Sequence, residues 1–64
     1  MADFYRVLVE ILMAHGCTFV RSAKGSHEVW FSPVSGKNIT VPRSTKSRHT
    51  ANEILKQAGL DKAF

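Results

Sequence analysis

The chain has 64 residues, which is enough for one small domain, residues 1–64, and leaves no room for a separate cofactor-binding domain. Its one cysteine, Cys17, excludes an internal disulfide, and its apolar residues are too scattered for a secretory signal or a membrane span, so we expect a cytoplasmic protein that does not bind membranes. The formal net charge of +4 comes from residues 20–48, which hold six lysines and arginines but a single acidic residue, Glu28.

The first predicted element is an amphipathic helix, because apolar residues recur at helical spacing on one face: Phe4, Val7, Leu8, Ile11 and Leu12. Asp3 is suited to be its N-cap, and Gly16 to be the C′ residue that follows its end. His15 in the last turn is better suited to hydrogen bonding at the helix end than to catalysis.

Three β-strands are expected next, over residues 17–22, 27–32 and 37–41, because these stretches are rich in β-favouring residues and are separated by turn-forming ones. In the second strand, alternation puts Val29 and Phe31 on one face and Glu28 and Trp30 on the other. Trp30 could stack on a base or anchor a partner, but packing against the sheet is the more common role of such a residue. Pro42 ends the third strand because it has no backbone N–H.

A second helix is expected after a basic connector, residues 43–49, that has no apolar periodicity. Thr50 and Glu53 form a T-x-x-E capping box, which predicts that the helix begins there. Its buried stripe is predicted to consist of Ala51, Ile54, Leu55 and Ala58. Gly59 is suited to end the helix, and we expect residues 61–64 to fray.

The order of elements is therefore α-β-β-β-α. Short turns make the three strands antiparallel neighbours, and both helices need one apolar surface on which to pack. The sequence thus predicts an α+β fold: a two-layer sandwich with a three-stranded antiparallel sheet and both helices on one face. This is the order of the double-stranded-RNA-binding-domain fold, which by itself says little about function.

Several short motifs follow one another in a characteristic order. They are His15-Gly16 at the end of the first helix, Arg21, Gly25-Ser26-His27, Val41-Pro42, and Thr50 with the stretch from Ile54 to Leu60. In this order and chain length they resemble the HicA family, small mRNA interferases of type II toxin–antitoxin systems. The resemblance implies a double-stranded-RNA-binding-like fold, mRNA cleavage that depends on His27, and a HicB-type antitoxin as the protein partner. Many members have a histidine where this chain has Ser44.

RNA can be cleaved without a metal because its own 2′-OH can attack the adjacent phosphate. The reaction needs a base, an acid and positive charge, and a free imidazole, with a pKa of about 6.5, populates both protonation forms near neutrality. We therefore expect His27 to be the catalytic residue of a metal-independent endoribonuclease. The residues expected to bind RNA are Arg21, Lys24, Gly25, Ser26, Lys37 and Arg43.

We expect neither a metal site nor a cofactor, because His15, Cys17, His27 and His49 lack the paired spacing of a zinc site. Two other functions remain open. The basic segment suggests nucleic acid as a partner, so the chain could be a non-catalytic RNA-binding module that uses the same basic face. It could also be an interaction domain for an acidic protein, and a basic segment is as often a solvated face.

Overall fold

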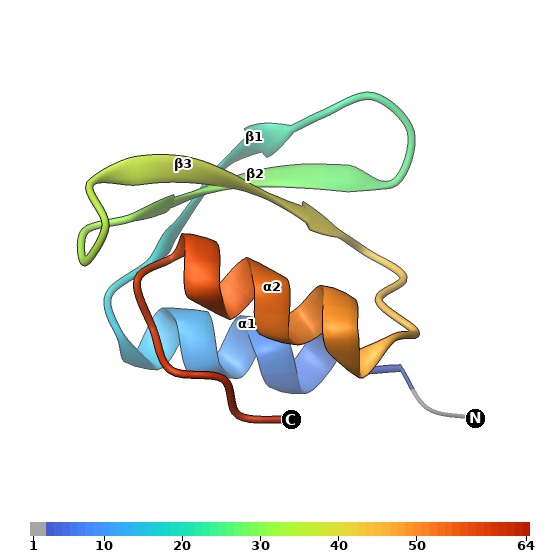
Figure 1. The fold of residues 1–64 in the computed structure, drawn as a ribbon. Coiled ribbons are helices and arrows are strands. Elements are labelled where there is room, and N and C mark those ends of the chain that lie inside the picture. Colours follow the sequence, from blue (N-terminus) through green and yellow to red (C-terminus); the bar gives the residue numbers. More distant parts are fainter. Residues whose placement is uncertain (1–2) are drawn as a thin grey trace.

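The computed structural model describes residues 3–64 and contains two helices and three strands (Figure 1). They are α1 (Tyr5–Ala14), β1 (Thr18–Ser22), β2 (His27–Ser32), β3 (Lys37–Pro42) and α2 (Arg48–Gln57). The strands form one antiparallel sheet in the order β1-β2-β3, and both helices lie on the same side of it. The predicted α+β architecture with the order α-β-β-β-α is confirmed. Neither of the helices within residues 3–64 is long and apolar enough to cross a membrane.

The core lies between the sheet and the helices. It contains apolar side chains of both helices and of β2 and β3: Leu8, Leu12, Trp30, Ile39, Val41, Ala51, Ile54, Leu55 and Ala58. Trp30 is only 5% exposed, so the face of β2 that carries Glu28 and Trp30 is the one that the helices cover. Packing is therefore the role of Trp30, and its alternative role in stacking a base is wrong. Alternation leaves His27, Val29 and Phe31 on the open face, which no helix covers, although Val29 itself is only 8% exposed between its neighbours.

The register of the strands determines which residues lie beside one another. On one side of β2, the pairing with β3 runs from His27 opposite Pro42 to Ser32 opposite Lys37. On the other side, β1 is irregular, because one residue between Phe19 and Arg21 is left out of the pairing. Such a bulge shifts the alternation of side chains, and Arg21 comes to lie opposite Val29.

Both helices begin at residues other than the predicted ones, whereas both end where predicted. The N-cap of α1 is Phe4 rather than Asp3, although Asp3 Oδ1 still accepts a hydrogen bond from the backbone N–H of Tyr5 at 3.0 Å. The predicted capping box of α2 is wrong, because the N-cap is Ser47, whose hydroxyl accepts from the backbone N–H of His49 at 3.2 Å. Helix α2 therefore includes His49 as well as Thr50.

Both helices end in a Schellman motif. In α2, the backbone N–H of Gly59 donates to Lys56 and that of Leu60 donates to Leu55, and the same pattern at the end of α1 includes Gly16. His15 also acts as predicted, since its ring Nδ1 lies 2.9 Å from the carbonyl oxygen of Ile11. The helix ends are thus fixed by local hydrogen bonds.

The C-terminal residues do not fray as predicted. The side chain of Asn52 in α2 makes two hydrogen bonds with the backbone of Phe64, one as donor and one as acceptor. The ring of Phe64 packs edge-on against Phe4, with 5.2 Å between ring centroids. The tail therefore lies across both helices instead of leaving the fold.

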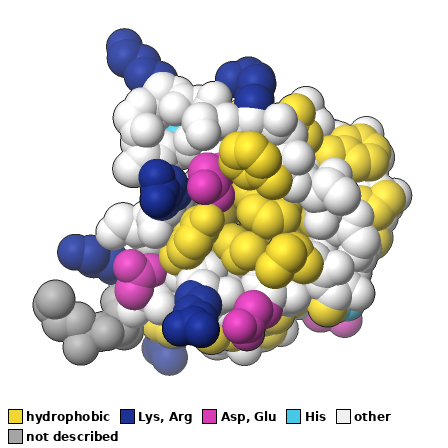
Figure 2. Space-filling model, turned by 180° about the vertical axis from the view of Figure 1, so that it is seen from behind, with side chains coloured by type: hydrophobic (Ala, Val, Ile, Leu, Met, Phe, Trp, Pro, Cys, Tyr) yellow, Lys and Arg dark blue, Asp and Glu magenta, His cyan; other side chains and the backbone are white. Residues whose placement is uncertain are grey.

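One side of the molecule is apolar. Figure 2 shows the side that faces away in Figure 1, where hydrophobic side chains gather in a patch between α1 and β1, with charged side chains at its border. These two elements expose four large apolar side chains about halfway: Val7, Met13, Phe19 and Val20. Contiguous exposed apolar surface in small domains commonly marks a contact site for another molecule.

Candidate nucleic-acid interface

The turn between β1 and β2 presents His27 to solvent. The backbone N–H of Ala23 donates to the carbonyl of His27 at 2.8 Å, and the backbone N–H of Arg43 donates to the carbonyl of Ser26, also at 2.8 Å. These two bonds hold both sides of the turn. The imidazole of His27 is exposed and has no hydrogen-bond partner among residues 3–64, so both ring nitrogens are available to a ligand.

Glycine is needed at position 25, at the tip of this turn, because of the backbone conformation there and not because a side chain would lack space. Its φ is +70°, in the left-handed region that L side chains rarely adopt, but an added Cβ would meet nothing within 4 Å. Lys24, Gly25 and Ser26 are all exposed. The turn therefore offers an ammonium, a hydroxyl and an uncovered backbone beside His27, which is a combination suited to a phosphate.

Arg21 is the cation that the sheet brings to the same face as His27. It lies opposite Val29 on the open face, and His27 is two residues from Val29 along β2. Diagonal neighbours of this kind have Cα atoms about 7–8 Å apart, which the long arginine side chain can span. Arg21 and Lys24 thus flank His27 from one strand and one turn.

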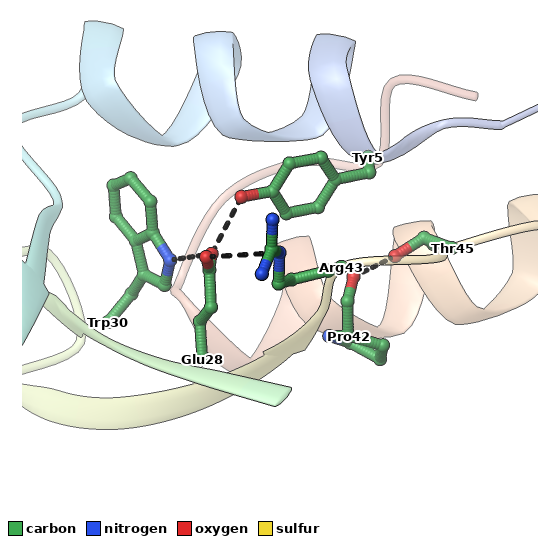
Figure 3. Close-up of polar contacts among 6 residues, drawn as sticks. All are labelled: Tyr5, Glu28, Trp30, Pro42, Arg43 and Thr45. Atoms are coloured by element: carbon green, nitrogen blue, oxygen red, sulfur yellow. Dashed lines mark hydrogen bonds and ion pairs between the residues drawn. The ribbon is translucent and has the colours of Figure 1, made fainter. Parts of the chain in front are cut away.

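Glu28, the next residue along β2, points to the other face and organises a polar cluster there (Figure 3). Its Oε1 accepts hydrogen bonds from the Tyr5 hydroxyl at 2.7 Å and from the Trp30 indole N–H at 3.1 Å. Its Oε2 lies 3.8 Å from Nε of Arg43. Burial raises the pKa of the Tyr5 phenol, and the hydrogen bond to Glu28 raises that pKa further.

Arg43 is fixed at the same end of the sheet but on the opposite face from His27. Its backbone bonds Ser26, and Thr45 closes the following turn by donating its hydroxyl to the carbonyl of Pro42 at 2.8 Å (Figure 3). Its guanidinium points toward Glu28, and the side chain as a whole remains 67% exposed. The side chains of His27 and Arg43 do not face one another, so a nucleic-acid strand would contact both only by passing around the end of the sheet. The burial of Thr45, within a connector that looks uniformly polar, was not predicted.

Lys37 does not lie near His27. It is opposite Ser32, at the far end of β2, and Ser32 is five steps along the strand from His27. At about 3.3–3.4 Å per residue this is about 17 Å. The structure therefore brings together Arg21, Lys24, Gly25, Ser26, His27 and the backbone of Arg43, and it leaves Lys37 outside the group.

A groove that the sequence does not predict runs along the outer edge of β3. Its volume is about 680 Å³, and it is lined by residues of β3 and of one side of α2: Thr40, Pro42, His49, Thr50, Glu53, Ile54 and Gln57. The spacing of His49, Glu53 and Gln57 by four residues could have indicated a common helix face, but only with the start of α2 correctly placed. Pro42, which lines the groove, is the register partner of His27, and His27 is the first residue after the turn.

Other chemistry finds less support in the described part of the chain. No group of three His, Cys, Asp or Glu side chains within residues 3–64 is arranged to hold a metal ion. Cys17 is buried, with 3% of its surface exposed, which makes it unsuited to be a nucleophile.

The fold and this interface define a small basic α+β domain of α-β-β-β-α order with an exposed imidazole among cations. A family model described as the HicA toxin of bacterial toxin–antitoxin systems matches residues 5–60. The chain belongs to this family, and the resemblance seen in the sequence motifs is confirmed. Comparisons with curated proteins and with solved structures give no match.

Proposed function

We propose that this HicA-family toxin is a metal-independent endoribonuclease that cleaves mRNA, with His27 as its acid/base residue. The observation that supports this most directly is the position of His27: an exposed imidazole without a protein partner among the described residues, beside Arg21 and the Lys24–Ser26 turn. A core or structural histidine would instead be buried or hydrogen-bonded, as His15 is.

The proposed reaction uses the 2′-OH of the RNA as nucleophile. The 2′-oxygen forms a bond to phosphorus, the bond from phosphorus to the 5′-oxygen breaks, and the products are a 2′,3′-cyclic phosphate and a 5′-OH. His27 accepts the proton of the 2′-OH and then returns one to the leaving 5′-oxygen, so the two transfers occur in sequence. Arg21 and Lys24 stabilise the negative charge that develops on the phosphoryl oxygens.

The test compares His27→Ala with His15→Ala, a matched control at the end of α1. We expect His27→Ala to lose mRNA cleavage and growth arrest while it still binds RNA, because the cations that hold phosphate are unchanged. His15→Ala should keep both activities. Cleavage by His27→Ala at the native rate would show that the catalytic assignment is wrong.

The alternative is a non-catalytic RNA-binding module that uses the same basic face. The clustering of Arg21, Lys24 and Arg43 at one end of the sheet supports RNA binding whether or not cleavage follows. The two functions are distinguished by the native protein itself. If it binds RNA with the expected salt dependence but releases no cyclic phosphate product, the binding module is correct.

The protein partner that we propose is a HicB-type antitoxin, in keeping with membership of a toxin–antitoxin family. The apolar patch between α1 and β1 (Figure 2) offers surface for such a contact, and an antitoxin that also reaches His27 would block the proposed site. Hydrogen exchange tests this with the co-expressed complex. We expect slower exchange for the backbone of residues 23–27 in the complex, and unchanged exchange there would argue for an indirect block.

A further inference from the structure

We propose that the groove between β3 and α2 is a nucleobase-binding subsite that selects guanine in the RNA strand held at His27. This inference rests on the proposed function for the position of the RNA, but it concerns residues outside the His27 turn. The groove is lined by seven residues, and its volume of about 680 Å³ lies in the range of small-molecule sites.

The lining has the composition of a base pocket. Pro42 supplies apolar surface for the face of a planar ring, Ile54, which is 4% exposed, adds little to it, and His49 offers a flat aromatic surface at one end. Glu53 and Gln57 supply hydrogen-bonding groups four residues apart on α2, where neighbouring Cβ atoms are about 5–6 Å from each other. Recognition of unpaired RNA bases typically combines such stacking surfaces with polar groups that contact the base edge.

The charge of the groove decides against a phosphate as its occupant. Glu53 is an exposed acid in the wall, and a carboxylate repels a phosphodiester. The cations of the proposed site, Arg21 and Lys24, lie at the turn instead. An RNA strand that places its phosphate at the turn satisfies both features when it directs a base toward the groove.

The donors and acceptors of the lining favour guanine among the four bases. A carboxylate accepts hydrogen bonds with two oxygens and donates none, and a glutamine amide both donates and accepts. Guanine presents two adjacent N–H donors, at N1 and N2, next to one acceptor, O6. Glu53 can accept from the two donors while the Gln57 amide donates to O6. The Watson–Crick edges of adenine, cytosine and uracil offer no pair of adjacent N–H donors on neighbouring ring positions.

The groove lies beside the proposed catalytic turn. His27 and Pro42 are register partners on adjacent strands, which lie about 4.8 Å apart. Pro42 is also part of the groove wall, and β3 is the edge strand of the sheet, with α2 beneath it (Figure 1). A nucleotide bound at His27 therefore has a neighbour whose base can pass over Pro42 into the groove.

The experiment measures binding of uncleavable RNA and cleavage of ordinary RNA by the full chain. Four 2′-O-methyl hexanucleotides of uridine with G, A, C or U at one central position lack the nucleophile and remain intact. Native protein should bind the guanine oligonucleotide about tenfold more tightly than the others. Glu53→Gln should reduce this preference to about twofold or less with little loss of affinity for the uridine oligonucleotide. Glu10→Gln, the same charge change at an exposed position of α1, should retain the full preference.

The outcomes separate the subsite from the proposed catalysis. If native protein cleaves RNA without a base preference, or if Glu53→Gln leaves the preference unchanged, the guanine subsite is wrong and the ribonuclease proposal stands. If no RNA is cleaved but the guanine preference is present and depends on Glu53, the subsite is supported and the catalytic proposal fails. A preference that Glu10→Gln removes equally would show a general charge effect and would also overturn the subsite.

Discussion

Substitution of Glu28 tests whether the fold depends on its carboxylate as a hydrogen-bond acceptor or as a charge. Glu28→Ala removes the acceptor for the Tyr5 hydroxyl and for the indole N–H of Trp30. The indole is 5% exposed and would lose its partner without access to water, at a cost of about 1–3 kcal/mol. The Tyr5 bond adds about 1 kcal/mol. The contact with Arg43, whose side chain is 67% exposed, adds about 0.5 kcal/mol or less.

The expected loss for Glu28→Ala is therefore about 3 kcal/mol, which is a large part of the roughly 3–10 kcal/mol that a chain of this length has in total. Glu28→Gln keeps an oxygen that can accept from both Tyr5 and Trp30, so it should cost only about 1 kcal/mol, or a fall of about 4–8 °C in Tm. Urea denaturation of the two variants and the native protein measures both losses in the free energy of unfolding. Equal losses for Ala and Gln would show that the charge, and not the acceptor, stabilises this end of the sheet.

Further predictions concern the turn, the phenol and the cations. Gly25→Ala and Gly59→Ala both place a side chain at positive φ, +70° and +80°, but only the second brings its Cβ to 3.0 Å from a valine methyl. Urea denaturation should show a loss of about 1–2 kcal/mol for the first and a larger loss for the second, and the reverse order would be contrary to this geometry. Because the pKa of Tyr5 is raised in the folded state, its contribution to stability is complete below pH 10 and is lost as the pH rises through the higher value. Native protein should thus lose stability more steeply above pH 10 than Tyr5→Phe, and parallel curves would contradict the shift. Arg21→Ala should slow cleavage and reduce the slope of log K for RNA binding against log salt concentration by about 0.7. Lys37→Ala should leave cleavage of a short oligonucleotide unchanged. Equal defects in the two variants would argue against the separation of these residues along the sheet.

The elements with local signals could be predicted well from the sequence. The bounds of β2 were predicted correctly, because His27 to Ser32 is a β-favouring run between two turns. The ends of both helices were marked by Gly16 and Gly59, whose hydrogen bonds involve only the preceding turn. The position of His27 beside Gly25 and Ser26 needed no tertiary information, since the three residues are consecutive.

The features that could not be predicted from the sequence depend on contacts between distant segments. Alternation separates Trp30 from Val29 but does not say which face the helices cover, and that face is fixed by packing across the whole core. Ser47 and Thr50 are both good N-cap residues, and the extended backbone of Ser47, with φ −113° and ψ 129°, selects the first. The groove beside β3 and the distance from His27 to Lys37 follow from strand order and register, which the sequence does not specify residue by residue.

The exposure of β1 has a consequence for the proposed site. All five of its side chains are exposed, and the strand is attached to the fold along only one edge, through an irregular ladder with β2. A segment with so few buried contacts opens at a lower free energy than the core. Arg21, carried by this strand, is therefore less firmly anchored than a residue of the central strand β2. A polyanion that holds Arg21 in place also favours the closed ladder, so ligand binding and completion of the sheet are thermodynamically linked.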